Sequence, residues 1–309
     1  MAKVLVTGGA GFIGSHLVDK LIEKGHKTFV LDNLSTGKKE NLNPQAEFKE
    51  ADICDFEAIK PFFNGVDFVF HLAAIPRVLI SVEDPVKTSK VNILGTVNVF
   101  KAAIEAKVKK IIFASSSSVY GEQEKLPLKE DMAPNPISPY GLQKIVVEQF
   151  AKLFTQLYGL PIISLRYFNV YGPRIDFESG YSLVLGRFLQ QKNQGQPLTI
   201  YGTGEQTRGF CYVSDVAEGT IKAIENEDLN GGEIINIGSE KSHSVNYLAK
   251  LIGGEIRSFP PRPGDPLHTM ADISKARILL GWQPQVSFEE GVKRTQEWFQ
   301  NQITQTPRV

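Results

Sequence analysis

The chain has 309 residues, which is enough for a sizeable core and two lobes. Its 34 Lys and Arg residues balance 34 Asp and Glu residues, so the net charge excludes a general attraction to nucleic acid or to an anionic membrane. The two cysteines, Cys54 and Cys211, lack the spacing of a metal site or a disulfide framework, and no metal is expected. No apolar run approaches the roughly 20 residues that span a bilayer, and Met1 leads into a strand rather than a signal peptide. We therefore expect a cytoplasmic protein without a nucleic-acid or membrane partner.

The first predicted unit is a strand, a glycine-rich turn, a helix and a second strand. In the turn, Gly8 permits the tight bend, Gly11 lets the backbone approach a pyrophosphate, and Gly14 lets the helix pack on the strand. The N-terminus of the helix offers free N–H groups and a positive dipole end to phosphates. This order is typical of a dinucleotide-binding unit, with the strands at Lys3–Thr7 and Lys27–Leu31 and the helix at Ser15–Lys24, ended by Gly25.

Asp32 follows the second strand, where its carboxylate can accept hydrogen bonds from the adenosine ribose. The same carboxylate would repel a 2′-phosphate, so NAD is favoured as the cofactor. Lys38 and Lys39 lie close by in the sequence and keep NADP as an alternative.

The next two predicted strands are Ala46–Glu50, which is weak, and Asp67–His71. Asp52 and Ile53 follow the first of them, in a position that could meet the adenine. The small residues after the second, in Leu72-Ala73-Ala74, allow a cofactor to approach closely. We interpret His71 as a core residue or a loop-positioning residue rather than a ligand.

A long helical segment is predicted from Asp84-Pro85 through Asn92 to Lys107, and a fifth strand at Lys110–Ala114. A run of four serines, Ser115 to Ser118, begins where that strand ends. Because ligands bind outside the carboxyl ends of strands in an open α/β sheet, we favour a functional role for the serines over a flexible loop.

The sequence Ser138-Pro139-Tyr140 begins a helix that is predicted to continue through Tyr158, and Pro139 suits its first turn. Tyr140 and Lys144 lie four apart and therefore on one face. A cation beside the phenol lowers its pKa from about 10 towards neutrality, so Tyr140 is a candidate general base. The predicted apolar stripe of the helix consists of Ile145, Val146, Phe150, Leu153, Phe154 and Leu157.

A sixth strand at Ile162–Arg166 completes an alternation of strands and helices, which predicts an α/β fold with a Rossmann-type, doubly wound parallel sheet. The second half has shorter elements and predicts a smaller α/β substrate-binding domain. We expect an NAD-binding domain at 1–168, with returning segments near 207–237, and a domain that binds mainly substrate at 169–309. Three helices are predicted there: Ser182–Gln191, a helix that runs from a Ser214-Asp215 cap to Glu225, and Phe288–Phe299. The predicted strands are Leu198–Tyr201, Thr207–Val213 and Ile234–Ile237, and a loop is predicted at Pro260–Gly264.

With these features together, the chain resembles an extended short-chain dehydrogenase/reductase, and within it the NAD-dependent nucleotide-sugar epimerase/dehydratase family. The similarity is greatest to UDP-hexose 4-epimerases, especially those that accept N-acetylated sugars. The motifs that carry it are Gly8-x-x-Gly11-x-x-Gly14, Ser115–Gly121 (SSSSVYG), Tyr140-x-x-x-Lys144, Arg166–Pro173 (RYFNVYGP), Arg208 to Asp215, and Arg262-Pro263-Gly264-Asp265.

The resemblance implies that Ser116, Tyr140 and Lys144 are catalytic, with Ser116 at the sugar O4 and Ser117 as its neighbour and substitute. It implies contacts with NAD by Gly8, Gly11, Phe12, Ile13, Gly14, Asp32, Asn33, Asp52, Ile53, Leu72, Ala73, Ala74, Asn92, Tyr140 and Lys144. It implies contacts with a UDP-sugar by Ser81, Ser116, Ser117, Tyr140, Asn169, Tyr201, Arg208, Arg262, Asp265 and Thr269. Arginine suits the diphosphate because its planar fork binds two oxygens at once, whereas we interpret Arg174 as a solvated charge.

Three positions depart from the family pattern. Gln143 replaces a frequent Ser or Thr, Gly209 replaces an Asp after Arg208, and Pro76 replaces a Lys found in some epimerases. None of the three removes a catalytic group, but Gly209 leaves the loop geometry beside Arg208 open.

The implied reaction is 4-epimerisation through a 4-keto sugar, with no net redox change. Dehydratases and decarboxylases of the family carry an acid in the serine loop, which Ser116-Ser117-Ser118 lacks. UDP-glucuronate 4-epimerases share the serines and remain the nearest alternative, although Asn169 stands where we would expect their Thr. An NADP-dependent 4-keto reductase and a non-catalytic NAD sensor also remain, since fold does not fix function.

Thr269 matches a position where epimerases restricted to plain hexoses have Tyr. The smaller side chain predicts that N-acetylated sugars are accepted as well. The helices around 92–107 and 140–158 carry more apolar surface than one face needs, which predicts a homodimer.

Overall fold

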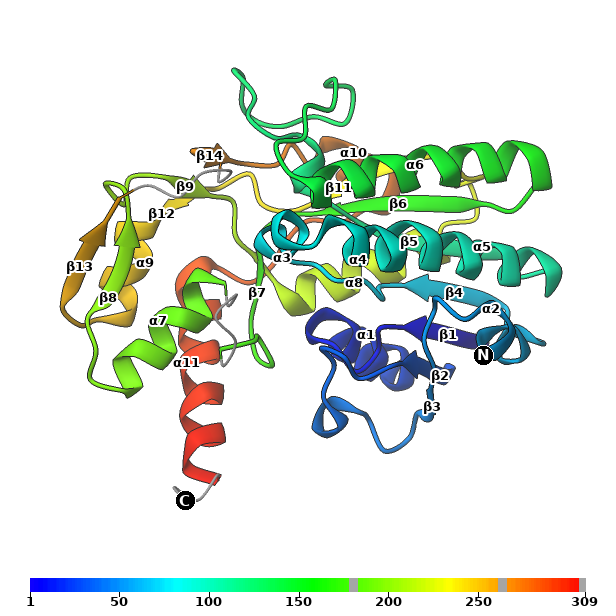
Figure 1. Ribbon diagram of the computed structural model, residues 1–309, viewed down its shortest axis with the longest axis horizontal. Coiled ribbons are helices and arrows are strands. Elements are labelled where there is room, and N and C mark those ends of the chain that lie inside the picture. Colours follow the sequence, from blue (N-terminus) through cyan, green and yellow to red (C-terminus); the bar gives the residue numbers. More distant parts are fainter. Residues whose placement is uncertain (178–182, 261–265, 306–309) are drawn as a thin grey trace.

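The centre of the molecule is a parallel sheet of seven strands in the order β11-β6-β5-β4-β1-β2-β3 (Figure 1). The computed structural model describes residues 1–177, 183–260 and 266–305. The inner strands are buried on both faces, as their continuous apolar sequences require. The strands are β1 (Lys3–Thr7), β2 (Lys27–Asp32), β3 (Glu47–Glu50), β4 (Phe68–His71), β5 (Lys110–Ser116), β6 (Ile162–Tyr167) and β11 (Ile234–Ile237). The predicted doubly wound α/β sheet is thus confirmed.

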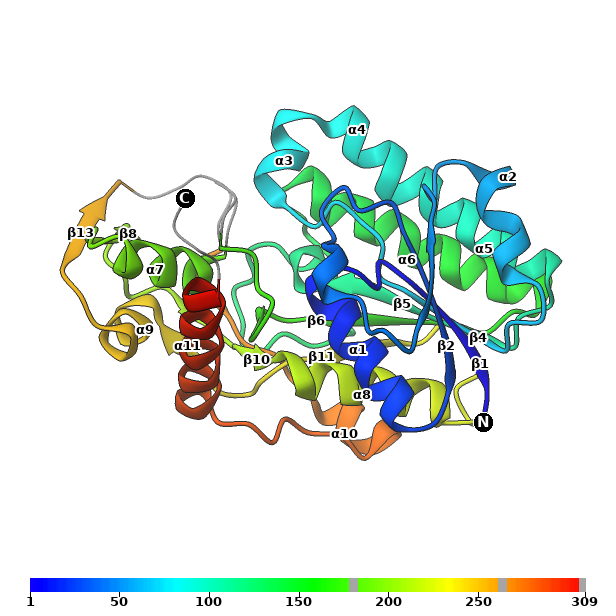
Figure 2. The same ribbon diagram turned by 90° about the horizontal axis from the view of Figure 1, so that it is seen from below.

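Helices cover both faces of this sheet (Figure 2). One face carries α1 (Phe12–Glu23) and α8 (Val213–Glu225), which pack against each other; the other carries α5 (Thr96–Glu105) and α6 (Pro139–Tyr158). Each face has its own buried core, with Val4 and Ile163 among the residues of the first and Leu5 and Ile111 among those of the second. Alternation along the strands sends successive side chains to opposite cores.

The predicted helical segment from Asp84 to Lys107 is interrupted by a π-helical stretch, η3 (Lys90–Gly95), between α4 (Pro85–Ser89) and α5. Asp84 caps α4 by accepting a hydrogen bond from the Lys87 N–H at 2.9 Å. A short helix that the sequence did not reveal, α3 (Val78–Glu83), precedes it. The other short helices before α6 are η1 (Lys39–Asn41), α2 (Phe56–Ile59), η2 (Lys60–Phe63) and η4 (Ser117–Val119).

After β6 the chain returns to the large sheet with β11 and otherwise forms smaller sheets. The prediction of one strand at Thr207–Val213 is wrong, because the backbone breaks at Gly209 into β9 (Thr207–Arg208) and β10 (Cys211–Tyr212), which belong to different sheets. The other elements are β7 (Val170–Tyr171), α7 (Val184–Asn193), β8 (Leu198–Tyr201), β12 (His243–Ser244), α9 (Val245–Ile252), β13 (Ile256–Phe259), β14 (His268–Thr269), α10 (Ser274–Leu280) and α11 (Phe288–Gln305). Ser182, the predicted start of the helix that forms α7, and the loop at 261–264 lie outside the described residues.

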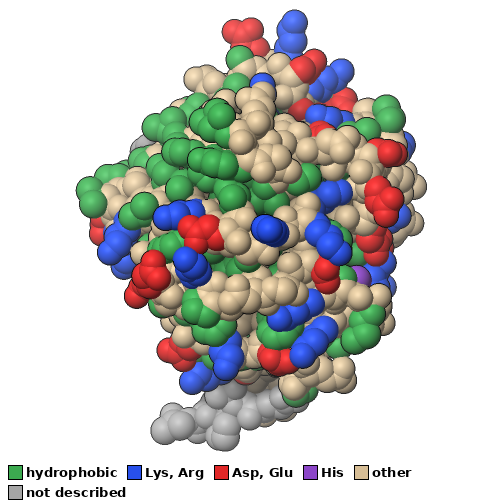
Figure 3. All heavy atoms as spheres, turned by 90° about the vertical axis from the view of Figure 1, so that its right-hand side faces the viewer, with side chains coloured by type: hydrophobic (Ala, Val, Ile, Leu, Met, Phe, Trp, Pro, Cys, Tyr) green, Lys and Arg blue, Asp and Glu red, His purple; other side chains and the backbone are tan. Residues whose placement is uncertain are grey.

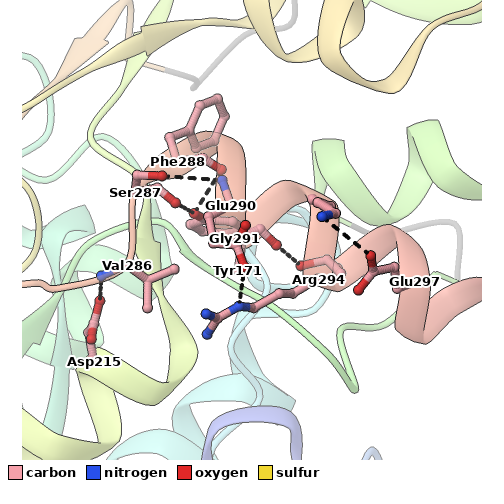
Figure 4. A network of polar contacts seen from close by, with 11 residues as sticks. Tyr171, Asp215, Val286, Ser287, Phe288, Glu290, Gly291, Arg294 and Glu297 are labelled. Carbon is pink, nitrogen blue, oxygen red and sulfur yellow. Dashed lines mark hydrogen bonds and ion pairs between the residues drawn. The ribbon is translucent and has the colours of Figure 1, made fainter.

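Ser214 and Asp215 do not cap α8 as predicted, because the helix already begins at Val213 and has no side-chain cap. Asp215 instead accepts hydrogen bonds from the backbone N–H groups of Gln285 and Val286, at 3.1 and 3.0 Å. Figure 4 shows this carboxylate beside the chain that leads into α11, where Tyr171 donates to the Phe288 carbonyl at 3.3 Å. Asp215 therefore anchors the C-terminal helix to the body of the protein.

None of the helices in the described part of the chain combines the length and the apolar character that crossing a membrane requires.

Candidate active site

A cavity of about 970 Å³ lies at the carboxyl ends of the large sheet and extends to the smaller sheets. Its lining includes the glycine turn, the ends of β2, β4 and β5, the start of α6, and residues of β8 and β9. Parallel strands all present their carboxyl ends at the same edge, which is why residues far apart in sequence meet there.

The glycine turn leaves no room for a side chain at Gly8 or at Gly14. Gly8 has φ +76°, and a Cβ there would lie 2.6 Å from the Ala73 nitrogen; a Cβ on Gly14 would lie 2.1 Å from the Gly8 oxygen. Gly11 is the N-cap residue of α1, and no side chain caps the helix there. The first residues of α1 line the cavity, so its uncapped N-terminus can serve as an anion site.

Asp32 lies at the end of β2 and lines the same cavity. Its carboxylate accepts hydrogen bonds from the N–H groups of Ala10 (3.0 Å) and Leu34 (2.9 Å), which fix its orientation. Burial raises the pKa of this carboxyl, while these two bonds act in the opposite direction. Each oxygen keeps a lone pair for a ribose hydroxyl. The glycine turn and Asp32 together fit a dinucleotide without a 2′-phosphate.

Ser116, Tyr140 and Lys144 meet at the cavity wall. Ser138 caps α6 by accepting from the Gly141 N–H at 3.2 Å, with Pro139 in the first turn as expected. The Ser116 hydroxyl donates to the Ser118 hydroxyl at 3.1 Å and lies close enough to Tyr140 to lower its pKa. The Lys144 ammonium donates to the Ala114 carbonyl at 2.7 Å and lies 5.7 Å from the centre of the Tyr140 ring.

The expected lowering of the Tyr140 pKa by Lys144 is not found. Burial raises the pKa of Tyr140 to about 12, and the Ser116 hydroxyl and the Arg77 charge oppose that shift. Burial also lowers the pKa of Lys144 to about 7. Both shifts come from burial, which disfavours the charged form of each group. In the protein alone Tyr140 is therefore neutral near pH 7, where Lys144 is close to its midpoint.

The opposite side of the cavity carries Asn169, Arg208 and Thr269. Asn169 has a left-handed backbone conformation, with φ +38°, and its amide donates to the Thr269 hydroxyl at 2.9 Å. Arg208 pairs in register with Thr269 across β9 and β14. The open question at Gly209 is resolved by packing, because a Cβ there would lie 2.9 Å from the Ser239 oxygen and the Gly209 N–H donates to the Thr269 carbonyl at 2.6 Å.

Comparison with known proteins identifies the family to which this geometry belongs. Residues 4–238 match the model of the NAD dependent epimerase/dehydratase family. The chain belongs to this family. It is 38% identical to a UDP-glucose 4-epimerase of Mycolicibacterium smegmatis, over 97% of this chain and 99% of that one.

Two solved structures are similar over 97% of this chain and 99% of their own. One is a UDP-glucose 4-epimerase of Thermotoga maritima with UDP-glucose, at 43% identity and a TM-score of 0.93. The other is a UDP-N-acetylglucosamine 4-epimerase of Methanobrevibacter ruminantium with UDP-N-acetylmuramic acid, at 40% identity and a TM-score of 0.92. As a member of this family the chain is an enzyme, and its cofactor is NAD.

Most residues predicted to contact NAD or substrate line the cavity of this family member. On the cofactor side these are Gly8, Gly11, Phe12, Ile13, Gly14, Asp32, Asn33, Ile53, Leu72, Ala73, Ala74, Tyr140 and Lys144, and on the substrate side Ser116, Ser117, Asn169, Tyr201, Arg208 and Thr269. Arg262 and Asp265 lie outside the described residues.

Three predicted contact residues do not line the cavity. Asp52 accepts a hydrogen bond from the Asn33 amide at 3.2 Å, beside the wall. Ser81 is fully buried, donates to the Val78 carbonyl and accepts from the Tyr140 N–H at 3.0 Å. Asn92 is buried and binds both the N–H and the carbonyl of Ile75, at 2.8 and 3.1 Å. Ser81 and Asn92 thus hold the backbone of the wall from behind.

His71 is a buried structural residue, as interpreted from the sequence. Its ring lies 2.6 Å from the Thr7 hydroxyl and 2.9 Å from the Thr96 hydroxyl. Among the described residues, no three His, Cys, Asp or Glu side chains lie close enough together to hold a metal ion.

Arg77 is a site residue that the sequence reasoning missed. It lines the cavity, its charge lowers the pKa of Tyr140, and it forms an ion pair with Asp176 at 3.2 Å. The available signal was a single cation within the otherwise apolar run after β4. Arg174, interpreted as a solvated charge, lines the cavity too and pairs with Asp19 at 2.8 Å.

Proposed function

We propose that this enzyme interconverts the 4-epimers of UDP-hexoses, UDP-glucose with UDP-galactose and UDP-N-acetylglucosamine with UDP-N-acetylgalactosamine. The observation that carries the proposal is the placement of Ser116, Tyr140 and Lys144 together on one wall of the cavity. The stretch from Ser116 to Ser118, at the end of β5 and the start of η4, contains hydroxyls and no carboxylate. That stretch has no acid for dehydration or decarboxylation, whereas epimerisation at C4 needs none.

Bound NAD supplies reversible hydride exchange with C4 of the sugar. Tyr140 takes the proton from the 4-hydroxyl and returns it after the 4-keto sugar has turned its other face. Ser116 holds O4 by a hydrogen bond, and Lys144 supports the phenolate electrostatically. The positive charge of Arg77 acts on Tyr140 in the same direction.

The diphosphate of the substrate belongs, in this proposal, at the far side of the cavity. Arg208 offers a planar cation there and Asn169 an amide whose position the Thr269 hydroxyl fixes. The resemblance to the family supports three further proposals: Arg262 as a second diphosphate ligand, Asp265 at the uridine ribose, and a contact between the substrate and Tyr201, which lines the cavity. The division of the chain near residue 168 into NAD-binding and substrate-binding domains is also part of the proposal.

Relatives of this chain also include a UDP-glucuronic acid decarboxylase and a UDP-glucuronic acid 4-epimerase, so a glucuronate substrate is the second candidate. The test is incubation of the purified protein with UDP-glucose, UDP-N-acetylglucosamine and UDP-glucuronic acid, without added cofactor, followed by separation of the products. We expect 4-epimers of the first two. Conversion of UDP-glucuronic acid alone would overturn the proposal.

The same assay distinguishes an epimerase from the two other functional classes that the sequence leaves open. A 4-keto reductase would consume NADPH stoichiometrically, and a non-catalytic NAD sensor would form no product. The Tyr140→Phe variant should lose about 10²–10⁴-fold in kcat, the usual contribution of a general base, while it still binds UDP-sugar by calorimetry. Unchanged turnover would remove Tyr140 from the mechanism.

We propose in addition that the enzyme is a cytoplasmic homodimer. The cytoplasm suits two cysteines that are both free. The dimer is supported by apolar side chains of α6 that protrude from the surface, Leu142, Leu153, Leu157 and Tyr158.

A further inference from the structure

Behind the catalytic residues lies a buried ion pair that the proposed reaction does not use. Glu148 is one helical turn beyond Lys144 on α6, and Arg166 is on β6; they are 3% and 1% exposed. The carboxylate of Glu148 accepts from the Arg166 Nε at 2.9 Å and from its Nη2 at 2.7 Å. A bidentate pair so deeply buried is a poor source of net stability, because desolvation offsets its attraction. Its place behind the catalytic residues points instead to a role of the ion pair in the site.

Glu148 also binds the end of β5, at the residue between Ala114 and Ser116. Its Oε1 accepts from the Ser115 hydroxyl at 2.6 Å. Ala114, the residue before Ser115, supplies the carbonyl that holds the Lys144 ammonium, and Ser116, the residue after it, lowers the pKa of Tyr140. One carboxylate on α6 thus fixes the strand residue on which both catalytic contacts depend.

Glu148 carries the negative charge that raises the pKa of Lys144. The ammonium lies 5.7 Å from the centre of the Tyr140 ring on α6 and 4.7 Å from that of the Phe113 ring on β5. Its charge also acts on His71 of β4, whose pKa burial lowers to about 3, so that this ring is neutral. Arg166 on β6 is engaged with Glu148 and stacks over the Tyr120 ring at 4.6 Å. Against the burial that lowers the pKa of Lys144 to about 7, Glu148 is the group that raises it.

We propose that Glu148 is a positioning residue that keeps Lys144 cationic and holds the end of β5 in register with the catalytic face of α6. The roles of Lys144 and Tyr140 in turnover rest on the proposed function. The electrostatic part of the inference does not, and it can be measured without substrate.

The experiment measures the titration of Lys144 directly. The purified protein is labelled briefly with acetic anhydride across a pH series, and the labelling of each lysine is read by peptide mass spectrometry. In the wild type we expect the Lys144 midpoint near pH 7. Glu148→Gln keeps the shape and removes the charge, and it should lower the midpoint by about one pH unit or more, the usual effect of losing a close counter-charge.

Two further variants separate charge from architecture. Arg166→Met leaves the carboxylate in place, so its Lys144 midpoint should stay or rise although the fold is weakened. Glu148→Gln with Arg166→Met avoids an uncompensated buried guanidinium and should fold even where the single variant does not. Its Lys144 midpoint should lie below that of Arg166→Met by the same amount by which Glu148→Gln lies below the wild type. Equal Lys144 midpoints within each of these two pairs, with only a lower melting temperature in the Gln variants, would reduce Glu148 to a structural residue and overturn the proposal.

Activity gives the second readout. In Glu148→Gln the alkaline limb of the kcat profile, where Lys144 loses its proton, should move to lower pH together with the labelling midpoint. If the wild type converts no UDP-sugar, the proposed function fails, while the labelling experiment still decides the role of Glu148.

Discussion

At the scale of single residues, we propose that Thr269 sets the substrate range of the site. Its side chain is 5% exposed, lines the cavity and accepts a hydrogen bond from Asn169. Thr269→Tyr would fill the adjacent space with a ring and remove that bond. We expect a loss of 10-fold or more in kcat/KM for UDP-N-acetylglucosamine, the size of a steric exclusion in a pocket, with a smaller loss for UDP-glucose. Thr269→Ser is the matched control. Equal losses on both substrates would contradict the specificity role.

Buried histidines predict how stability depends on pH. Burial lowers the pKa of His71 to about 3 and that of His16 to about 4, below the unfolded value of 6.5. Between pH 6 and 4 the unfolded chain therefore binds protons that the native protein does not, and stability falls as the pH falls. Each histidine should contribute a slope of about 1.4 kcal/mol per pH unit.

His71→Asn removes one of these titrations. Urea unfolding at several pH values between 6 and 4.5 should give a slope shallower than the wild-type slope by about 1.4 kcal/mol per pH unit. Carboxyl groups titrate in both proteins and cancel in the difference. Parallel profiles for the two proteins would show that His71 is protonated in the native state.

The sequence located most cavity residues because their positions follow from strand ends and from a glycine turn that tolerates no side chain. It did not give the direction of a side chain. Ser81 and Asn92 match family positions, but their polar atoms bind the backbone of α6 and of Ile75 behind the wall. Arg77 went unnoticed because no motif marks a lone cation, although the fold carries it to the catalytic tyrosine.

At the scale of elements, the large sheet was predictable because continuous apolar strands alternate with amphipathic helices. Which face of α6 is buried was not predictable in the same way. Its buried residues include Gln143, Lys144 and Glu148, whereas Leu153 and Leu157 of the predicted apolar stripe are exposed. Ile145, Phe150 and Phe154 of that stripe do pack against the core, so hydrophobicity alone gives the orientation of α6 only in part. The π-helical stretch η3 was equally hidden, since its sequence continues the helical pattern on both sides.

Gln143 ties these two elements together. Its amide donates to the hydroxyls of Thr88 (2.9 Å) and Ser89 (3.1 Å) and accepts from Asn92 at 2.8 Å. Gln143→Leu would leave these buried groups without a partner, so we expect a loss of about 1–3 kcal/mol in the free energy of unfolding. Because Asn92 holds Ile75 in the cavity wall, NAD affinity should fall as well.

The control is Gln149→Leu, the same change at an exposed position of the same helix. Urea unfolding and NAD titration of both variants test the link between α6 and η3. Two variants with equal stability and equal NAD affinity would contradict it.

At the scale of the whole molecule, one end of the protein carries apolar side chains that the fold does not use. Figure 3 shows hydrophobic side chains gathered over the upper left of this end. The exposed apolar residues of α6 include Leu153 and Leu157, at 45% and 63%, and α4 and η3 add Val86 and Leu94, at 80% and 50%. Contiguous exposed apolar surface is typical of association sites.

Because these residues lie on helices α4 to α6, a second copy could bury them in a helical bundle, and the dimer should depend on them. Leu157→Glu would place a charge in that interface, since a buried charge without a partner is strongly unfavourable. We expect a shift from dimer to monomer, read by light scattering during gel filtration, with far-UV circular dichroism unchanged. Ile278→Glu is the matched control, because Ile278 is 81% exposed on α10. A wild-type protein that is already monomeric at micromolar concentration, or an equal effect of the two substitutions, would contradict a dimer built on α6.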